Sequence, residues 1–229
     1  GPSVYSARAQ TQEELDRHLV RCVKQLAGLE FYGEGVRCVK QLLGLDINDL
    51  HPYEESDYLD YGVRYKNMGL SIKEALLDGA DPNVRTQYQY HWNDEGEPEY
   101  REGGLLHLPT VHCFENGHRL TSYAVDIIRE LKSFGIDMNQ VDSKNDKDLP
   151  SQETALHYAC WAKSSCEPGI RSPIVKALLD CGADPNKTNS RGMTCLHDLV
   201  FLRWYNERLL EENDTLVTML FSYGHRAID

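Results

Sequence analysis

One short pattern recurs along the chain: an apolar helical run that ends at glycine and is followed by Asp and Asn. It occurs as SIKEALLDGADPN at 71–83, DIIRELKSFGIDMN at 126–139 and PIVKALLDCGADPN at 173–186. LVTMLFSYGHRAID at 216–229 keeps the apolar run and the glycine, and VKQLLGLDIN at 39–48 is a fainter copy. Self-similarity at intervals of about 20 to 50 residues indicates an array of small units, none of which buries its apolar face alone.

A second pattern precedes the last three runs. It reads GLLHL at 104–108, ETALHYA at 153–159 and MTCLHDL at 193–199. The Thr154 and Thr194 hydroxyls can cap the helices that follow them. Glycine just past a helical run favours a left-handed C-cap, and the next Asp and Asn suit tight turns. The sequence therefore predicts a series of helix pairs joined by turns.

The two alternating patterns resemble the ankyrin repeat, whose T-P-L-H motif opens an inner helix and whose G-A-D-x-N motif opens a hairpin finger. Ala155 and Cys195 stand where the family has its helix-opening proline. The resemblance covers roughly residues 35–229 and is strongest over 150–229. It implies an all-α fold, an ankyrin-repeat solenoid of stacked helix-turn-helix pairs with hairpin fingers and about five repeats.

The spacing of the repeats departs from the family period of about 33 residues. Intervals of 56, 47 and 42 residues separate Gly79, Gly135, Gly182 and Gly224. The finger Asn186 lies 11 residues before His197, whereas Asn83 lies 24 residues before His107. The hairpin before His107 therefore carries an insertion, which an array tolerates because it maps to a loop.

The repeats divide the chain as follows. The opening Gly-Pro-Ser resembles a tag remnant, so we expect a flexible N-terminus at 1–10 and a single domain over 11–229. RCVKQL occurs at 21–26 and again at 37–42, and we interpret the two copies as helices of a degenerate capping repeat. The predicted units are that capping repeat at 11–48, repeats at about 49–83, 84–139 and 140–186, and a C-terminal capping repeat at 187–229.

Charge and cysteine content limit the function classes. The chain has 24 basic and 36 acidic side chains, a net charge of −12, so nucleic acid is excluded as a partner and a basic protein is favoured. No apolar stretch approaches the length of a membrane span. The seven cysteines form no CxxC pair, which predicts free thiols inside the cell, in cytoplasm or nucleus. We expect no metal and no cofactor.

The insertion RTQYQYHWNDEGEPEYREGG at 85–104 combines aromatic with acidic side chains. This mixture suits a Lys- or Arg-rich segment through cation–π contacts and charge pairing. The alternative is a mobile acidic loop whose aromatic side chains fold back on the neighbouring finger. The predicted partner-binding residues are Tyr88, Tyr90, Trp92, Glu95, Glu97, Glu99 and Tyr100.

Two further groups of residues raise the question of chemistry. His107, His157 and His197 occur once per repeat, about 10 Å apart, too far for one metal ion, and are predicted to bond neighbouring fingers. Cys160 and His157 are three residues apart on one expected helix. A catalytic dyad also needs an orienting group and an oxyanion hole, and the sequence indicates neither. We therefore predict no enzymatic activity.

The resemblance implies a non-catalytic module for protein–protein interaction that binds through its concave surface. Two alternatives remain open: a substrate-receptor subunit of a ubiquitin ligase, or a regulatory ankyrin domain of a larger enzyme. Asn139 and Asn186 each have a leucine eight residues upstream, Leu131 and Leu178. They resemble ankyrin sites of asparaginyl hydroxylation and are candidate hydroxylation sites; the alternative is that both are turn-forming asparagines that stay unmodified.

Overall fold

The computed structural model describes residues 11–26, 72–92, 98–112, 118–144, 152–161, 168–202 and 209–224. Its helices are α1 (Gln12–Leu26), a short helix at 72–77, α4 (His107–His112), α5 (His118–Ser133), α6 (Ala155–Cys160), α7 (Arg171–Asp180), α8 (Cys195–Leu202) and α9 (Leu210–Ser222). The strands are β1 (Arg85–Trp92), β2 (Pro98–Gly104) and β3 (Ser143–Lys144). The described chain is mostly helical, in agreement with the repeat patterns.

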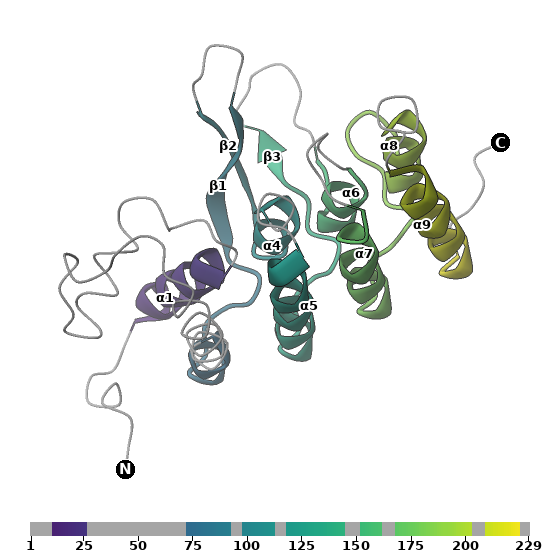
Figure 1. Cartoon of the computed structure of the whole chain (residues 1–229). Helices are drawn as coiled ribbons and strands as arrows, with labels where there is room; N and C mark the ends of the chain where they lie inside the picture. Colours follow the sequence, from purple (N-terminus) through teal and green to yellow (C-terminus); the bar gives the residue numbers. More distant parts are fainter. Residues whose placement is uncertain are drawn as a thin grey trace, which may run out of the picture.

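The helices lie in pairs, and the pairs stand side by side (Figure 1). α4 contacts α5, α6 contacts α7 and α8 contacts α9. Between pairs, α4, α6 and α8 form one row, the inner row, while α5, α7 and α9 form the outer row. Buried side chains of both rows, of α1 and of the turn before α4 form one apolar core, which includes Leu19, Leu106, Leu156, Leu178 and Leu216. The sequence predicts helices that begin near His157 and His197 and a helix over 173–181, and α6, α8 and α7 confirm them.

Helix α6 begins at the residue that the sequence indicates. The Thr154 hydroxyl accepts a hydrogen bond from His157 N at 3.4 Å, and Thr154 N donates to His157 Nδ1 at 3.2 Å. This reciprocal exchange satisfies two backbone donors at the helix start. Thr194 N likewise donates to His197 Nδ1, at 3.0 Å, before α8. The predicted Thr154 cap is confirmed.

The turns after the outer helices also follow the sequence prediction. Gly135 and Gly182 have φ values of 85° and 95°, in the left-handed region that favours glycine. Asp137 Oδ1 then accepts from Asn139 N at 2.9 Å, and Asp184 Oδ1 accepts from Asn186 N at 2.8 Å. These local bonds hold each finger in a tight turn.

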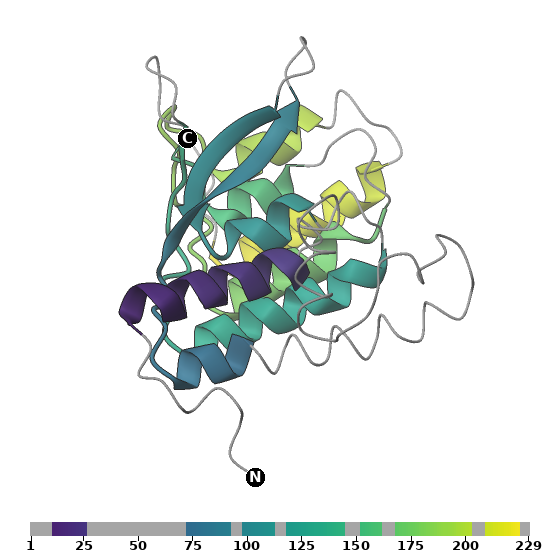
Figure 2. The same ribbon diagram turned by 90° about the vertical axis from the view of Figure 1, so that its left-hand side faces the viewer.

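The insertion at 85–104 forms strands that the all-α expectation did not include. β1 and β2 pair antiparallel as a hairpin, and β3 adds to β2, so the sheet order is β1-β2-β3. The hairpin rises above the helix rows in Figure 1, and Figure 2 shows it on the opposite side of α1 from the short helix 72–77. No described helix has the length and apolar character to span a bilayer.

Helix α1 packs beside the short helix 72–77 and its turn. Gln12 Nε2 donates to Gly79 O at 3.0 Å, and Asp16 Oδ1 accepts from Asp81 N at 2.7 Å. The second RCVKQL copy, at 37–42, lies outside the described residues. The division into a capping repeat at 11–48 and a repeat at about 49–83 therefore stays a prediction.

Candidate functional site

The base of the β1–β2 hairpin is buried. Tyr88 and Arg101 are opposite each other in the strand register, and Tyr88 is only 2% exposed. The Tyr88 ring stacks on His107, with ring centroids 5.9 Å apart, and meets the Tyr158 ring edge-on at 6.5 Å. Burial raises the pKa of the Tyr88 hydroxyl well above its usual value. Tyr88 thus folds back on its neighbours, which leaves its ring out of reach of a partner.

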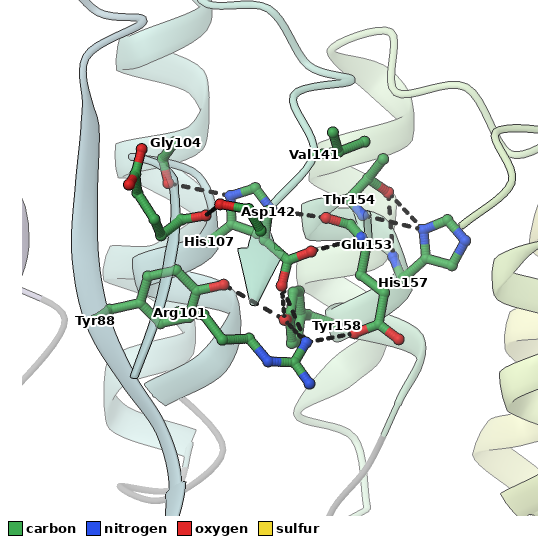
Figure 3. A network of polar contacts seen from close by, with 12 residues as sticks. Tyr88, Arg101, Gly104, His107, Val141, Asp142, Glu153, Thr154, His157 and Tyr158 are labelled. Carbon is green, nitrogen blue, oxygen red and sulfur yellow. Dashed lines mark hydrogen bonds and ion pairs between the residues drawn. The ribbon is translucent and has the colours of Figure 1, made fainter. Parts of the chain in front are cut away.

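Arg101 holds the hairpin to the next helix pair through a buried polar network (Figure 3). Its Nη1 lies 3.0 Å from Asp142 Oδ2 and 2.9 Å from Glu153 Oε2, and it also contacts the Tyr158 hydroxyl. The Tyr158 hydroxyl donates to Asp142 Oδ2, and Glu153 N donates to Asp142 Oδ1 at 2.6 Å. A buried carboxylate such as Asp142 is tolerated only when charges and donors surround it in this way.

The predicted structural role of the histidines is confirmed at two positions. His107 Nε2 lies 3.0 Å from Glu153 O, and His157 Nε2 lies 3.1 Å from Met193 O. Each ring therefore bonds the finger of the following repeat. Burial lowers the pKa of both His107 and His157, so both imidazoles are neutral near pH 7.

The two glycines at the end of β2 allow a close approach. A Cβ atom on Gly104 would lie 1.6 Å from Gln140 Oε1, and one on Gly103 would lie 2.9 Å from His107 Nδ1. Gln140 Nε2 in turn donates to Asn83 O at 3.1 Å and lies 3.2 Å from Asn83 Oδ1. The Gly-Gly step thus lets the hairpin pass directly over the next finger.

The predicted partner-binding residues have different outcomes. Tyr88 is buried, as described above, whereas Tyr100 is 52% exposed and lies opposite Gln89 in the strand register. The structure describes no side-chain position for the others: Tyr90, Trp92, Glu95, Glu97 and Glu99. Tyr90, Trp92 and Glu99 belong to the two strands by their backbone.

Asparagine side chains connect successive fingers. Asn83 Oδ1 accepts from Asp137 N at 2.7 Å, and Asn139 Oδ1 accepts from Asp184 N at 2.8 Å. Asn186 Nδ2 donates to Gly224 O at 3.1 Å. Both candidate hydroxylation residues, Asn139 and Asn186, therefore belong to a ladder of bonds between neighbouring repeats.

Nucleophilic and metal chemistry find little support in the described residues. Cys160 is fully buried, and a hydrogen bond with Cys195 together with burial raises the pKa of its thiol. A reactive cysteine needs the opposite, an accessible thiolate with a lowered pKa. No three potential metal-ligand side chains cluster within the described ranges.

Sequence reasoning missed three residues of this site: Asp142, Tyr158 and Asp198. Asp142 and Tyr158 complete the Arg101 network. Asp198 follows His197 on α8 and is 4% exposed. Its burial is the main cause that raises its pKa to about 7, and the negative charge of Glu153 adds to this effect. The only available signal was Arg101 itself, the one basic residue in an acidic stretch.

A family model for the ankyrin repeat matches residues 151–190. This stretch contains the capped helix α6, its partner α7 and the turn from Gly182 to Asn186. No curated protein matches the chain. The matched repeat has the helix pair and the finger that recur on both sides of it, and the match supports an ankyrin-repeat assignment through this one repeat.

Proposed function

We propose that this chain is a non-catalytic protein-interaction module that binds a basic segment through its concave face and the β1–β2 hairpin. Ankyrin repeats generally mediate protein–protein interaction. The net charge of −12 supports a cationic partner, because the summed field of the chain attracts positive charge and raises the association rate. The finer fold belongs to the same proposal: a solenoid of about five repeats with an extended inner surface.

The observation that carries this proposal is the buried attachment of the hairpin. Tyr88 and Arg101 tie the base of the insertion to Tyr158, Asp142 and Glu153 in the next repeat. A surface element held in one position loses less conformational entropy when it binds than a free loop does. The described strands β1 and β2 therefore extend from a base that is held in place.

The exposed Tyr100 supports a contact role for the outer part of the hairpin. Buried aromatic anchors contribute about 2 kcal/mol or more to an interface, whereas rim charge pairs contribute about 0–1 kcal/mol each. We therefore assign most of the affinity to the aromatics Tyr90, Trp92 and Tyr100. The carboxylates Glu95, Glu97 and Glu99 mainly steer the basic partner.

The cysteines support a location inside the cell, in cytoplasm or nucleus. The described cysteines Cys22, Cys160, Cys181 and Cys195 are all free thiols. Free thiols persist in reducing compartments. The buried, high-pKa thiol of Cys160 supports the non-catalytic assignment.

A shortened hairpin tests the proposed function. Replacing residues 90–99 by Asn-Gly joins Gln89 to its partner Tyr100 through a two-residue turn and keeps Tyr88 and Arg101 in place. The partner is first identified by crosslinking and mass spectrometry, and its affinity for both forms is then measured by biolayer interferometry. We expect the shortened form to keep its thermal stability and to lose at least tenfold in affinity. Equal affinity of the two forms would overturn the proposal.

A further inference from the structure

The outer edge of β1 carries unpaired backbone groups. β1 stands at one end of the sheet order β1-β2-β3, so β2 covers one of its edges and no described strand pairs with the other. The register with β2 is regular from Arg85 to Gln89. Across the described ranges, the only further bond to the backbone of this stretch runs from the Thr86 hydroxyl to Gln87 O. Alternate residues of an antiparallel strand direct both N–H and C=O away from the partner strand, so this edge is a template for another strand.

β1 lacks most features that protect the edge of a sheet. Edge strands commonly carry proline, charged side chains or a bulge, which hinder pairing with another chain. β1 contains no proline, Arg85 is its only permanently charged residue, and its register irregularity lies beyond Gln89, toward the tip of the hairpin. The Arg85 guanidinium bonds Glu102 Oε1 at 3.1 Å and Val141 O at 2.9 Å. Its charge is therefore directed across the sheet toward β2 and β3, away from the outer edge.

A groove runs beside the first residues of this edge. Its volume is about 560 Å³, within the range of about 300–1,000 Å³ that is typical of binding sites. Figure 1 shows α1 on the side of β1 that faces away from β2, and Figure 2 views the molecule from this side. Val20 of α1 and Val84, which precedes β1, both line the groove and pack partly against the core. They give the groove an apolar floor.

Asp16 gives the same groove a negative charge. Asp16 lies on α1 and lines the groove, and its Oδ1 accepts from Asp81 N at 2.7 Å. In the part of the chain that the structure describes, no cation forms an ion pair with Asp16. Arg17, which also lines the groove, is paired with Glu13 at 2.6 Å, and Arg85 is held over the sheet. A positive charge brought to Asp16 would therefore find an acid that is not already neutralised.

We propose that an extended segment of the partner protein binds in this groove as an additional strand on β1, with one Lys or Arg side chain at Asp16 and an apolar side chain against Val20 and Val84; this rests on the proposed function. In strand addition, backbone hydrogen bonds supply affinity and pockets select the side chains. Only an extended chain matches donors and acceptors that are spaced along a strand. A second copy of this chain is less suited, because each copy would bring Asp16 and a net charge of −12 to the contact.

Amide hydrogen exchange tests the edge before any probe is added. In the whole free chain, we expect alternate amides between Arg85 and Gln89 to exchange rapidly, because their N–H groups point away from β2. Protection of every amide in this stretch would overturn the proposal, because this chain or a second copy of it would then already occupy the edge.

The probe is a short acetylated peptide in which valine and lysine alternate, and the same peptide with glutamate in place of lysine is the control. In ¹H–¹⁵N NMR spectra of the whole chain, we expect the lysine peptide alone to shift the amides of α1 and of residues 85–89. Two further lysine peptides are N-methylated at one or the other set of alternate residues. One of them should lose at least tenfold in affinity and the other should keep it, because strand addition uses the N–H groups of every second residue. No shift with the lysine peptide, or equal losses in the two methylated peptides, would refute strand addition.

Variants of the groove complete the test. Val20→Lys places a cation in the groove and should weaken binding of the lysine peptide at least tenfold, whereas Val200→Lys, at an exposed valine on α8, should leave it unchanged. Asp16→Asn keeps the acceptor for Asp81 N and should weaken binding about two- to fivefold. Unchanged affinity in either groove variant would contradict the site. The outcome is separate from that of the proposed function, since the shortened hairpin keeps residues 85–89, and partner binding that ignores Val20→Lys would leave the interaction module standing.

Discussion

Tyr88 and Arg101 lie directly opposite each other on β1 and β2, and both side chains turn into the protein rather than toward a partner. Tyr88 contributes ring contacts with His107 and Tyr158. Arg101 contributes ion pairs with Asp142 and Glu153. The hairpin thus has a structural base and a separate outer part. This division determines which substitutions should change stability and which should change binding.

Arg101→Ala should lower the free energy of unfolding by about 3–5 kcal/mol, because it leaves Asp142 buried without its cation. The exposed i,i+4 pair Arg17–Glu13 provides the control, and Arg17→Ala should cost about 0–1 kcal/mol. Urea denaturation measures both values. Hydrogen exchange should also become faster at the β1–β2 amides of Arg101→Ala, and protection equal to that of the wild type would contradict the anchoring role.

Gly104→Ala should displace the Gln140 amide, since the new Cβ would lie 1.6 Å from Gln140 Oε1. The displaced amide loses its bonds to Asn83, at a cost of about 1–2 kcal/mol. Gln140→Ala removes the same bonds, so the double variant should be hardly less stable than either single variant. Thermal denaturation of the four proteins completes this cycle, and additive effects would show that Gly104 acts through another contact.

Asp198→Asn should change the pH dependence of stability. The folded-state pKa of Asp198 is raised to about 7, above the unfolded value of about 4, so its contribution favours folding at low pH and is lost as the pH rises through this window. Asp198→Asn has no carboxyl group to ionise at this position, so its stability does not fall in this way as the pH rises. Relative to the wild type, Asp198→Asn should therefore gain about 2–4 kcal/mol between pH 4 and pH 8. A constant difference in urea denaturation across this range would be inconsistent with the raised pKa.

Trp92→Ala and neutralisation of the three glutamates should affect different rate constants. For the identified partner, Trp92→Ala should raise the dissociation rate at least tenfold, as expected for a buried aromatic anchor. Glu95→Gln, Glu97→Gln and Glu99→Gln together should slow association and flatten its salt dependence. Phe221→Ala, at an exposed aromatic residue on α9, is the matched control. The division would be refuted by stopped-flow kinetics in which Trp92→Ala changes only the association rate and the three glutamate substitutions change only the dissociation rate.

Asn139 and Asn186 should carry one added oxygen atom in protein purified from its own cells, because both have a leucine eight residues upstream. Asn83, which has Ala75 at that position, is the internal control and should be unmodified. Since Asn139 bonds the next finger through Asp184 N, modification requires this rung of the ladder to open. Peptide mass spectrometry reads all three sites, and unmodified Asn139 and Asn186 would count against the hypothesis.

The helices and turns could be predicted because their signals are local. Thr154 and His157 are three residues apart, which is the spacing of the two partners in a helix cap. Asp184 and Asn186 likewise form their turn within a few residues. The hairpin base could not be predicted in this way. Arg101 reaches Asp142 and Glu153 across 41 and 52 residues, and only the packed repeats bring these side chains together.

The aromatic pattern of the insertion was ambiguous for the same reason. Tyr88 and Tyr100 look alike in the sequence, yet Tyr88 meets His107 and Tyr158 while Tyr100 lies on the exposed face of the hairpin. A two-residue alternation cannot tell which face of a hairpin will be covered. Asp198 carried no signal at all, because a single acid after Leu-His is also typical of a solvated helix.

The attachment of the hairpin alters how the repeats share stability. In an array whose units touch only their neighbours, cooperativity depends on the interface between adjacent units. Arg85 and Arg101 belong to one repeat by sequence, but they bond Val141, Asp142 and Glu153 of the next. This junction is thereby reinforced beyond helix stacking. The two repeats on either side should open as one unit, so that a ligand held by the hairpin would stabilise both against local unfolding.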